Sequence, residues 1–181
     1  MSIMNNEKTI ILIGDSITEG FNVRQMVKKR NILNYGVSGD STVECLERIS
    51  ARWFDPPVGI VYLCIGTNDL VRDRTDQEIL ENIRMIVERV RKYSPDTMLK
   101  LTSLFPTRDN PPRPNERIRT FNAGLKQLSI ALNTGYVDIH HHFADEHGDL
   151  QKEFTEDGLH LTDAAYRRWA EILLTELDSL D

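Results

Sequence analysis

Three residues near opposite ends of the chain carry the side chains that a nucleophilic reaction needs. Ser16 follows an apolar run at residues 10–13 that is typical of a buried strand. Asp157 and His160 are three positions apart, so both side chains can emerge from a single turn. A serine hydroxyl attacks a carbonyl carbon when an imidazole takes its proton and a carboxylate orients that imidazole. These residue types predict Ser16 as a nucleophile, His160 as its base and Asp157 as the orienting group.

Two further positions offer hydrogen-bond donors for the negative charge that such an attack creates. Asn68 has a side-chain amide just after an apolar run, and removing a donor of this kind can lower kcat by about 10²–10³-fold. Gly39 can bring its backbone N–H close to a ligand because it has no side chain. Both residues also fit an ordinary turn, and a turn that aims the Asn68 amide satisfies both interpretations.

The nucleophile and its partners have a structural interpretation as well. Asp15 and Ser16 are both good helix caps, and Asp15 is expected to hold the turn rather than to react. Asp157 and His160 would then be surface residues ahead of a helix capped by Thr162. Each motif alone fits this interpretation, whereas the nucleophile hypothesis explains them together.

A histidine-rich segment follows the last predicted strand and needs a test as a metal site. Its candidate ligands are Asp138, His140, His141, His142, Asp145 and His147. Zinc needs several ligands that converge with tetrahedral geometry, and three adjacent histidines do not converge on one face. We therefore expect a solvated loop here, with no metal and no other cofactor in the reaction.

The elements that must position these residues alternate between strand-like and helix-like patterns. The predicted strands cover residues 9–14, 32–37, 59–65, 97–104 and 135–139. The predicted helices cover residues 22–29, 41–53, 76–93, 118–132 and 162–177. This alternation predicts an α/β fold with a parallel sheet and helices on both faces. Because ligands bind beyond the carboxyl ends of parallel strands, the turns at 14–16, 36–39 and 66–69 and the loop from Phe105 should meet at one rim.

Length and composition limit the class of protein. A chain of 181 residues with 40% hydrophobic and 28% charged residues suits a single domain over 1–181 with a sizeable core. The net charge is −6 and no basic stripe occurs, so we expect a small-molecule substrate and no nucleic-acid partner. Residues 1–8 lack the apolar core of a signal peptide, and no run is long enough to span a bilayer, which predicts a cytoplasmic location.

Four separated blocks give the chain a specific resemblance. They are GDSIT at residues 14–18, NYGVSG at 34–39, GTND at 66–69 and DGLH at 157–160. In this order they resemble the SGNH (GDSL-type) hydrolases. The resemblance implies a flavodoxin-like, three-layer α/β/α sandwich with a five-stranded parallel sheet, and hydrolysis of esters or thioesters. It also implies that Ser16, His160 and Asp157 are catalytic, and that the N–H groups of Ser16 and Gly39 and the amide of Asn68 form an oxyanion hole.

The resemblance extends to the small acetylhydrolases of this family, which include platelet-activating-factor acetylhydrolase-like and carbohydrate O-acetylesterase-like members. We therefore predict a serine esterase that removes short acyl groups, acetyl above all, from a carbohydrate or similar polar carrier. The proline-rich loop at 105–117 is expected to face the substrate, where Arg108 or Arg113 would meet a polar leaving group or else remain solvated. The alternatives are a lysophospholipase or thioesterase with the same three residues, and a non-catalytic flavodoxin-like binding module.

Overall fold

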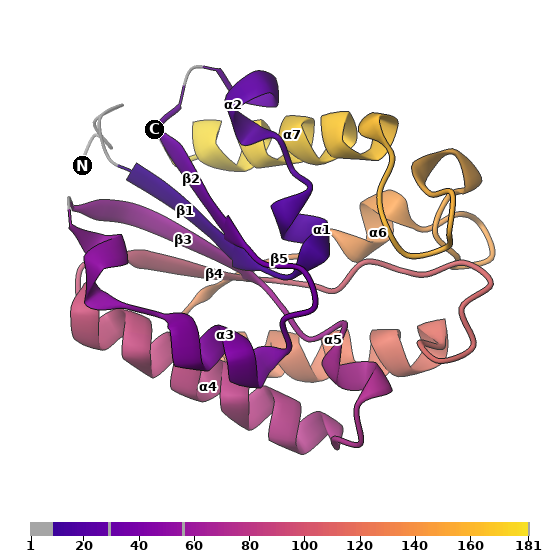
Figure 1. Cartoon of the computed structure of the whole chain (residues 1–181), viewed down its shortest axis with the longest axis horizontal. Helices are drawn as coiled ribbons and strands as arrows, with labels where there is room; N and C mark the ends of the chain where they lie inside the picture. The colour runs from indigo at the N-terminus through magenta and orange to yellow at the C-terminus, as the bar shows by residue number, and fades with distance from the viewer. Residues whose placement is uncertain (1–8, 29, 56, 181) are drawn as a thin grey trace.

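Five parallel strands form one sheet in a computed structural model that describes residues 9–28, 30–55 and 57–180. The strands are β1 (Thr9–Gly14), β2 (Ile32–Gly36), β3 (Val58–Cys64), β4 (Met98–Thr102) and β5 (Gly135–Val137). They lie in the order β2-β1-β3-β4-β5, so β3 is the central strand, and β1 pairs with β2 on one side and with β3 on the other (Figure 1). Two predictions lie outside the described residues: the polar segment 1–8 and the helix end at Lys29.

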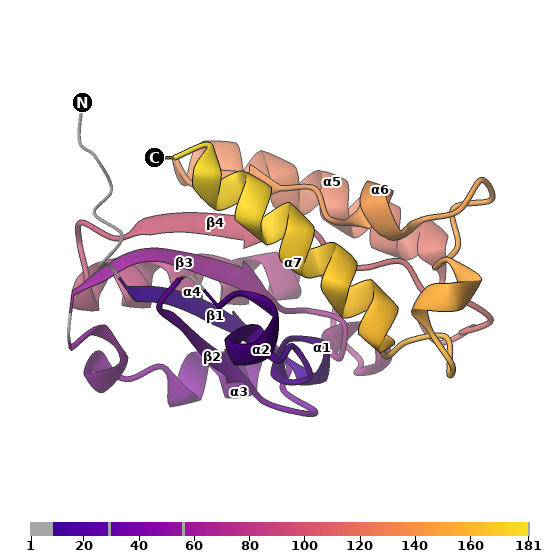
Figure 2. The same cartoon turned by 90° about the horizontal axis from the view of Figure 1, so that it is seen from above.

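Helices cover both faces of this sheet, which confirms the predicted α/β architecture. They are α1 (Ser16–Glu19), α2 (Val23–Met26), α3 (Thr42–Arg48), α4 (Asp76–Tyr93), α5 (Asn115–Ala131), α6 (His140–Phe143) and α7 (Asp163–Asp178), with the 3₁₀ turns η1 (Ala51–Phe54), η2 (Asp69–Val71) and η3 (Lys152–Phe154). In Figure 1, α3, α4 and α5 lie below the sheet and α1, α2 and α7 above it. Viewed from above, α7 crosses over the strands (Figure 2).

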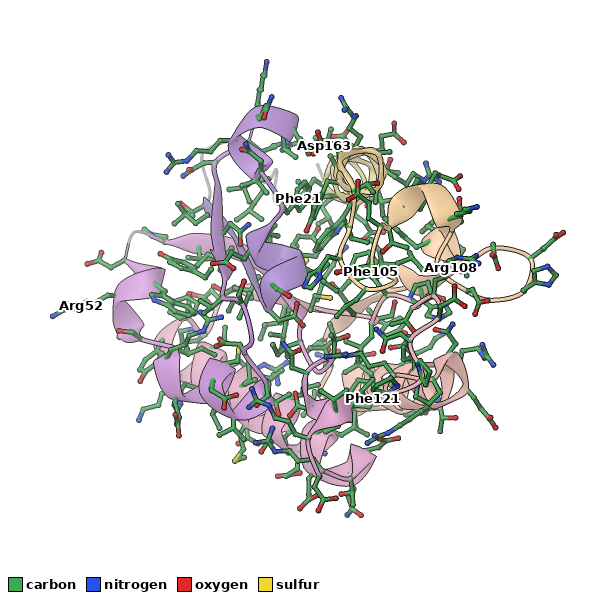
Figure 3. The ribbon with its side chains drawn as sticks, turned by 45° about the vertical axis from the view of Figure 1, so that its right-hand side comes forward. Phe21, Arg52, Phe105, Arg108, Phe121 and Asp163 are labelled. Atoms are coloured by element: carbon green, nitrogen blue, oxygen red, sulfur yellow. The ribbon has the colours of Figure 1, made fainter. Side chains whose placement is uncertain are left out.

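The core is divided by the sheet into two apolar layers. Alternate residues of the interior strand β1 enter opposite layers: Ile11 and Ile13 face α4 and α5, whereas Ile10 and Leu12 face α7. The large aromatic side chains divide in the same way, and Figure 3 shows Phe121 on the opposite side of the sheet from Phe21. This two-sided burial explains why the fully buried strands β1 and β3 are almost continuously apolar.

Two elements illustrate how closely the predicted ranges match the structure. The helix at 76–93 has its predicted bounds, because Thr75 and Glu78 form a capping box at its start. The helix predicted at 41–53 ends at Arg48: Ile49 is extended, and Ser50 caps the separate turn η1.

Three other predictions need correction. The helix predicted over 22–29 is reduced to the single turn α2, since Val27 leaves helical geometry, and the separate turn α1 precedes it. The solvated loop expected at 140–142 starts with the helical turn α6, which ends on the fully buried Phe143. The helix predicted from residue 118 begins three residues earlier, directly after Pro114.

None of the helices in the described ranges combines the length and apolar character needed to cross a membrane.

The core layer below the sheet gives a test of packing. We expect Ile86→Ala to lower the free energy of unfolding by about 2–5 kcal/mol, because Ile86 on α4 is fully buried. The adjacent Met85 is exposed, so Met85→Ala should change that free energy by less than about 0.5 kcal/mol. Urea unfolding of both variants measures the difference, and equal losses would contradict the assignment of the buried face.

Candidate active site

The turn after β1 places Ser16 at the first position of a helix. Asp15 caps α1, since its Oδ1 accepts the N–H of Ile17 at 3.0 Å, and the Ser16 hydroxyl takes no part in the cap. Gly14 makes the turn possible, because a Cβ there would lie 2.0 Å from the Thr18 hydroxyl. Asp15 is therefore the residue that caps the helix, as expected, and the Ser16 Oγ remains free to contact other groups.

The structure brings Ser16, His160 and Asp157 into one hydrogen-bonded chain. Ser16 Oγ lies 3.1 Å from His160 Nε2, and His160 Nδ1 lies 2.6 Å from Asp157 Oδ2. A carboxylate beside Nδ1 favours the tautomer with its proton on that nitrogen, which leaves the Nε2 lone pair facing the hydroxyl. In this state the imidazole can accept the serine proton.

Asp157 is held in its ionised form by the turn that it starts. Its Oδ1 accepts the backbone N–H groups of Leu159 and His160 at 2.9 and 2.8 Å. Partial burial raises the pKa of Asp157, but the hydrogen bonds from the His160 ring and from these two N–H groups outweigh it and lower the pKa to about 2. The carboxylate is thus charged at neutral pH and can stabilise an imidazolium.

The turn from Asp157 to His160 is fixed against the β4–α5 loop. Gly158 has a φ of 82°, and a Cβ there would lie 1.9 Å from the carbonyl oxygen of Arg108. The Arg108 N–H donates to the Gly158 carbonyl at 2.9 Å, while the Arg108 side chain binds the Leu150 carbonyl and Asp145. Arg108, labelled in Figure 3, is therefore engaged in joining these loops, and not free to meet a leaving group.

Two of the predicted oxyanion donors, Asn68 and Gly39, lie on loops that a hydrogen bond connects. Asn68 Nδ2 donates to the Asp40 carbonyl at 2.9 Å, which links the loop after β3 to the loop after β2. This bond uses one of the two amide hydrogens, so the second is available for a ligand. Gly39, the neighbour of Asp40, has a φ of 82°, and no atom lies within 4 Å of the position where a Cβ would stand. Gly39 therefore leaves space for a ligand beside its backbone.

The third predicted donor is the N–H of Ser16, at the first position of α1, where a backbone N–H has no acceptor within its own helix. Its loop joins the others through Val37, whose N–H donates to the Gly14 carbonyl at 3.1 Å. The carboxyl ends of β1, β2 and β3 therefore meet at the predicted rim.

Buried ion pairs beneath this rim were not found from the sequence. Asp69 is fully buried, accepts hydrogen bonds from the N–H and hydroxyl of Thr42, and pairs with Arg74 at 2.8 Å. Arg48 pairs with Asp40 and also donates to the Gly14 carbonyl at 3.1 Å. The ion-pair partners are only five and eight positions apart, but the sequence does not show that Asp69 also reaches Thr42 or that Arg48 reaches the Gly14 carbonyl.

Asp15 is an ionisable group buried next to the nucleophile. Burial raises its pKa to about 6, against the opposing effects of the Ile17 N–H and the charges of His160 and Arg113. It remains a capping residue in the structure, as expected.

The residues of the histidine-rich segment each contact a different partner. The His140 N–H donates to Ser103 Oγ at 2.9 Å, His141 lies 3.6 Å from Asp138, and Asp145 pairs with Arg108. Within the described ranges, no three or more histidine, cysteine, aspartate or glutamate side chains form a group that could hold a metal ion.

Comparison with known proteins gives a consistent set of matches. The sequence model of the GDSL-like lipase/acylhydrolase family matches residues 12–168. The chain is similar to a Streptococcus pneumoniae protein that bears the name of platelet-activating factor, with 32% identity, a TM-score of 0.89, and coverage of 97% of this chain and 86% of that one.

Two curated relatives are similar in sequence. Rat platelet-activating factor acetylhydrolase IB subunit alpha1 is 27% identical over 90% of this chain and 72% of its own length. Escherichia coli N-acylneuraminate cytidylyltransferase is 26% identical over 87% of this chain, and the chain spans only 37% of that relative's length.

Gly158 provides a test of the turn that carries His160. We expect Gly158→Ala to lower kcat/KM by at least about 100-fold, because the new Cβ must displace the turn from Arg108 and move the imidazole from Ser16. Gly148→Ala is the matched control, since Gly148 has a φ of 84° but faces only the flexible end of Arg119. Ester hydrolysis measures both, and equal activity of the two variants would contradict this role of the Gly158 contact.

Asp15 provides a test of the electrostatics. A carboxyl group with pKa near 4 when unfolded and about 6 when folded binds more protons in the folded state between these values. Its contribution to stability is therefore lost as the pH rises through this window. Asp15→Asn retains a capping oxygen but cannot titrate. Between pH 4 and pH 7, we expect the free energy of unfolding of wild type, measured in urea, to fall by roughly 2 kcal/mol relative to that of Asp15→Asn. A difference between the two proteins that stays constant with pH would contradict the raised pKa.

Proposed function

The chain belongs to the GDSL-like lipase/acylhydrolase family and is an ester-hydrolysing enzyme, and we propose that it removes short acyl groups, acetyl above all, from a carbohydrate or similar polar carrier through an acyl-enzyme on Ser16. The observation that carries the proposal is the 3.1 Å contact between Ser16 Oγ and His160 Nε2, with Asp157 behind the ring. Membership in a hydrolase family argues against the alternative that the chain is a non-catalytic binding module.

The proposed reaction begins with attack of Ser16 Oγ on the ester carbonyl carbon. His160 Nε2 takes the hydroxyl proton, and the Asp157 carboxylate stabilises the imidazolium that forms. The oxyanion is stabilised by the N–H groups of Ser16 and Gly39 and by the free amide hydrogen of Asn68. His160 then gives its proton to the leaving alcohol.

The acyl-enzyme is then hydrolysed by the same groups. Water attacks the acyl carbon as His160 Nε2 removes its proton, and the second oxyanion is held by the same three donors. When this intermediate collapses, His160 returns the proton to Ser16 Oγ and the carboxylic acid leaves.

Two observations support a short acyl group on a polar carrier. The β4–α5 loop borders a hollow of about 370 Å³ that includes Arg113, a residue also bonded to Asn68. Its other lining residues are mainly polar: Thr107, Asp109, Asn110, Pro111, Pro114, Asn115 and Asp149. The apolar cavity between β1, β3 and α7 holds only about 10 Å³, which is too small for an acyl chain.

A lysophospholipase or thioesterase with the same three residues is the second candidate. The acetylhydrolase subunits among the relatives are named for platelet-activating factor and not for a carbohydrate, which favours this candidate as far as the carrier is concerned.

Hydrolysis of p-nitrophenyl acetate, butyrate and octanoate by wild type and Ser16→Ala tests the proposal. We expect acetate to be hydrolysed with at least tenfold higher kcat/KM than octanoate, and Ser16→Ala to lose at least about 10³-fold in kcat. Ser38→Ala is the control, because Ser38 is an exposed serine of the neighbouring loop bonded to Glu19.

Other results of this assay would contradict the proposal or favour the second candidate. Full activity of Ser16→Ala would contradict the nucleophile, and a preference for octanoate would favour the second candidate. Acetate release from O-acetylated sugars, compared with fatty-acid release from lysophospholipids, then identifies the carrier.

A further inference from the structure

The Asn68 amide is held at both ends by groups from other loops. Arg113, from the proline-rich β4–α5 loop, donates from Nη2 to Asn68 Oδ1 at 3.3 Å and from Nε to the Thr67 carbonyl at 3.1 Å. At the other end, Asn68 Nδ2 donates to the Asp40 carbonyl at 2.9 Å. The amide thus has a donor against its oxygen and an acceptor against its nitrogen.

This pairing fixes which way the amide points. A guanidinium has only donors, and a backbone carbonyl has only acceptor lone pairs. If the Asn68 amide turned over, its N–H groups would face the N–H groups of Arg113 and its oxygen would face the Asp40 oxygen. Both contacts would be repulsive. The orientation observed leaves one N–H free, whereas the reverse orientation would present an oxygen lone pair to a developing oxyanion.

Arg113 is itself held firmly in place. Its N–H donates to the Asn110 carbonyl at 2.9 Å, and its carbonyl accepts the Thr107 hydroxyl at 2.7 Å. Pro112 and Pro114 flank it, and a residue before proline is restricted to extended conformations. The prolines of the loop therefore reduce the freedom of the backbone that carries the guanidinium.

We infer that Arg113 is a positioning residue for ester hydrolysis, which acts by holding the Asn68 amide with an N–H directed at the oxyanion. The inference rests on the proposed function, in which Asn68 is an oxyanion donor. Arg113 acts on the transition state through Asn68 and not through binding of the ground-state ester. Its loss therefore lowers kcat and leaves KM nearly unchanged.

A double-mutant cycle on p-nitrophenyl acetate hydrolysis tests this coupling. We expect Arg113→Ala to lower kcat by about 10–100-fold with KM within about threefold of wild type, and Asn68→Ala to lower kcat by about 10²–10³-fold. In the double variant, Arg113→Ala should add less than about a threefold loss to that of Asn68→Ala. Arg113→Lys, which keeps a donor, should recover part of the lost kcat, and it replaces Arg113→Ala in the cycle if that variant does not fold.

Arg91→Ala is the matched control. Arg91 is a partly buried arginine at the end of α4 that donates to the Leu132 carbonyl at 2.6 Å. It reports the effect on stability of losing such a side chain, and its kcat should remain within about twofold of wild type.

Three results would overturn the inference. These are an unchanged kcat in Arg113→Ala, a rise in KM alone, and an equal loss from Arg113→Ala with and without Asn68. A fully active Asn68→Ala would also overturn it, while leaving the serine mechanism intact. Full activity of Ser16→Ala in the same assay would instead mark failure of the proposed function itself.

Discussion

The 3.1 Å contact between Ser16 Oγ and His160 Nε2 is the interaction on which the rest of the structure depends, because it joins residues 144 positions apart. A hydrogen bond weakens steeply with distance and misalignment, so both ends need rigid supports. On one side, Gly14 lets α1 start directly at the end of β1. On the other, Gly158 packs against Arg108, which joins the β4–α5 loop to the turn that carries His160. The parallel sheet supports both sides.

The proposed oxyanion site depends on a different kind of support. Its donors come from the loops after β1, β2 and β3, which have little regular structure of their own. Arginines connect these loops: Arg48 donates to the Gly14 carbonyl, Arg72 to the Gly39 carbonyl and Arg113 to the Asn68 amide. Because arginine offers several donors in a fixed planar geometry, one side chain can bind acceptors on two neighbouring segments at once. The rim is thereby preorganised from neighbouring loops.

The predictable parts of this protein are those encoded by local sequence. The apolar run of β1 marks the limits of that strand, and the apolar face and capping box of α4 mark the limits of that helix. The four sequence blocks identify the residues that the structure brings to one rim. The short helices α1 and α6 were missed because a single turn has no measurable periodicity. The partners of Arg108 and Arg113 could not be predicted, since the path of each loop decides which carbonyl or amide an arginine reaches.

The most direct test of the central claim is to react the folded enzyme with a fluorophosphonate and to locate the adduct by peptide mass spectrometry. We expect a single adduct on Ser16, formed far more slowly in His160→Ala because the hydroxyl then has no base. An adduct on another residue, or none on a folded protein that still hydrolyses esters, would contradict Ser16 as the nucleophile.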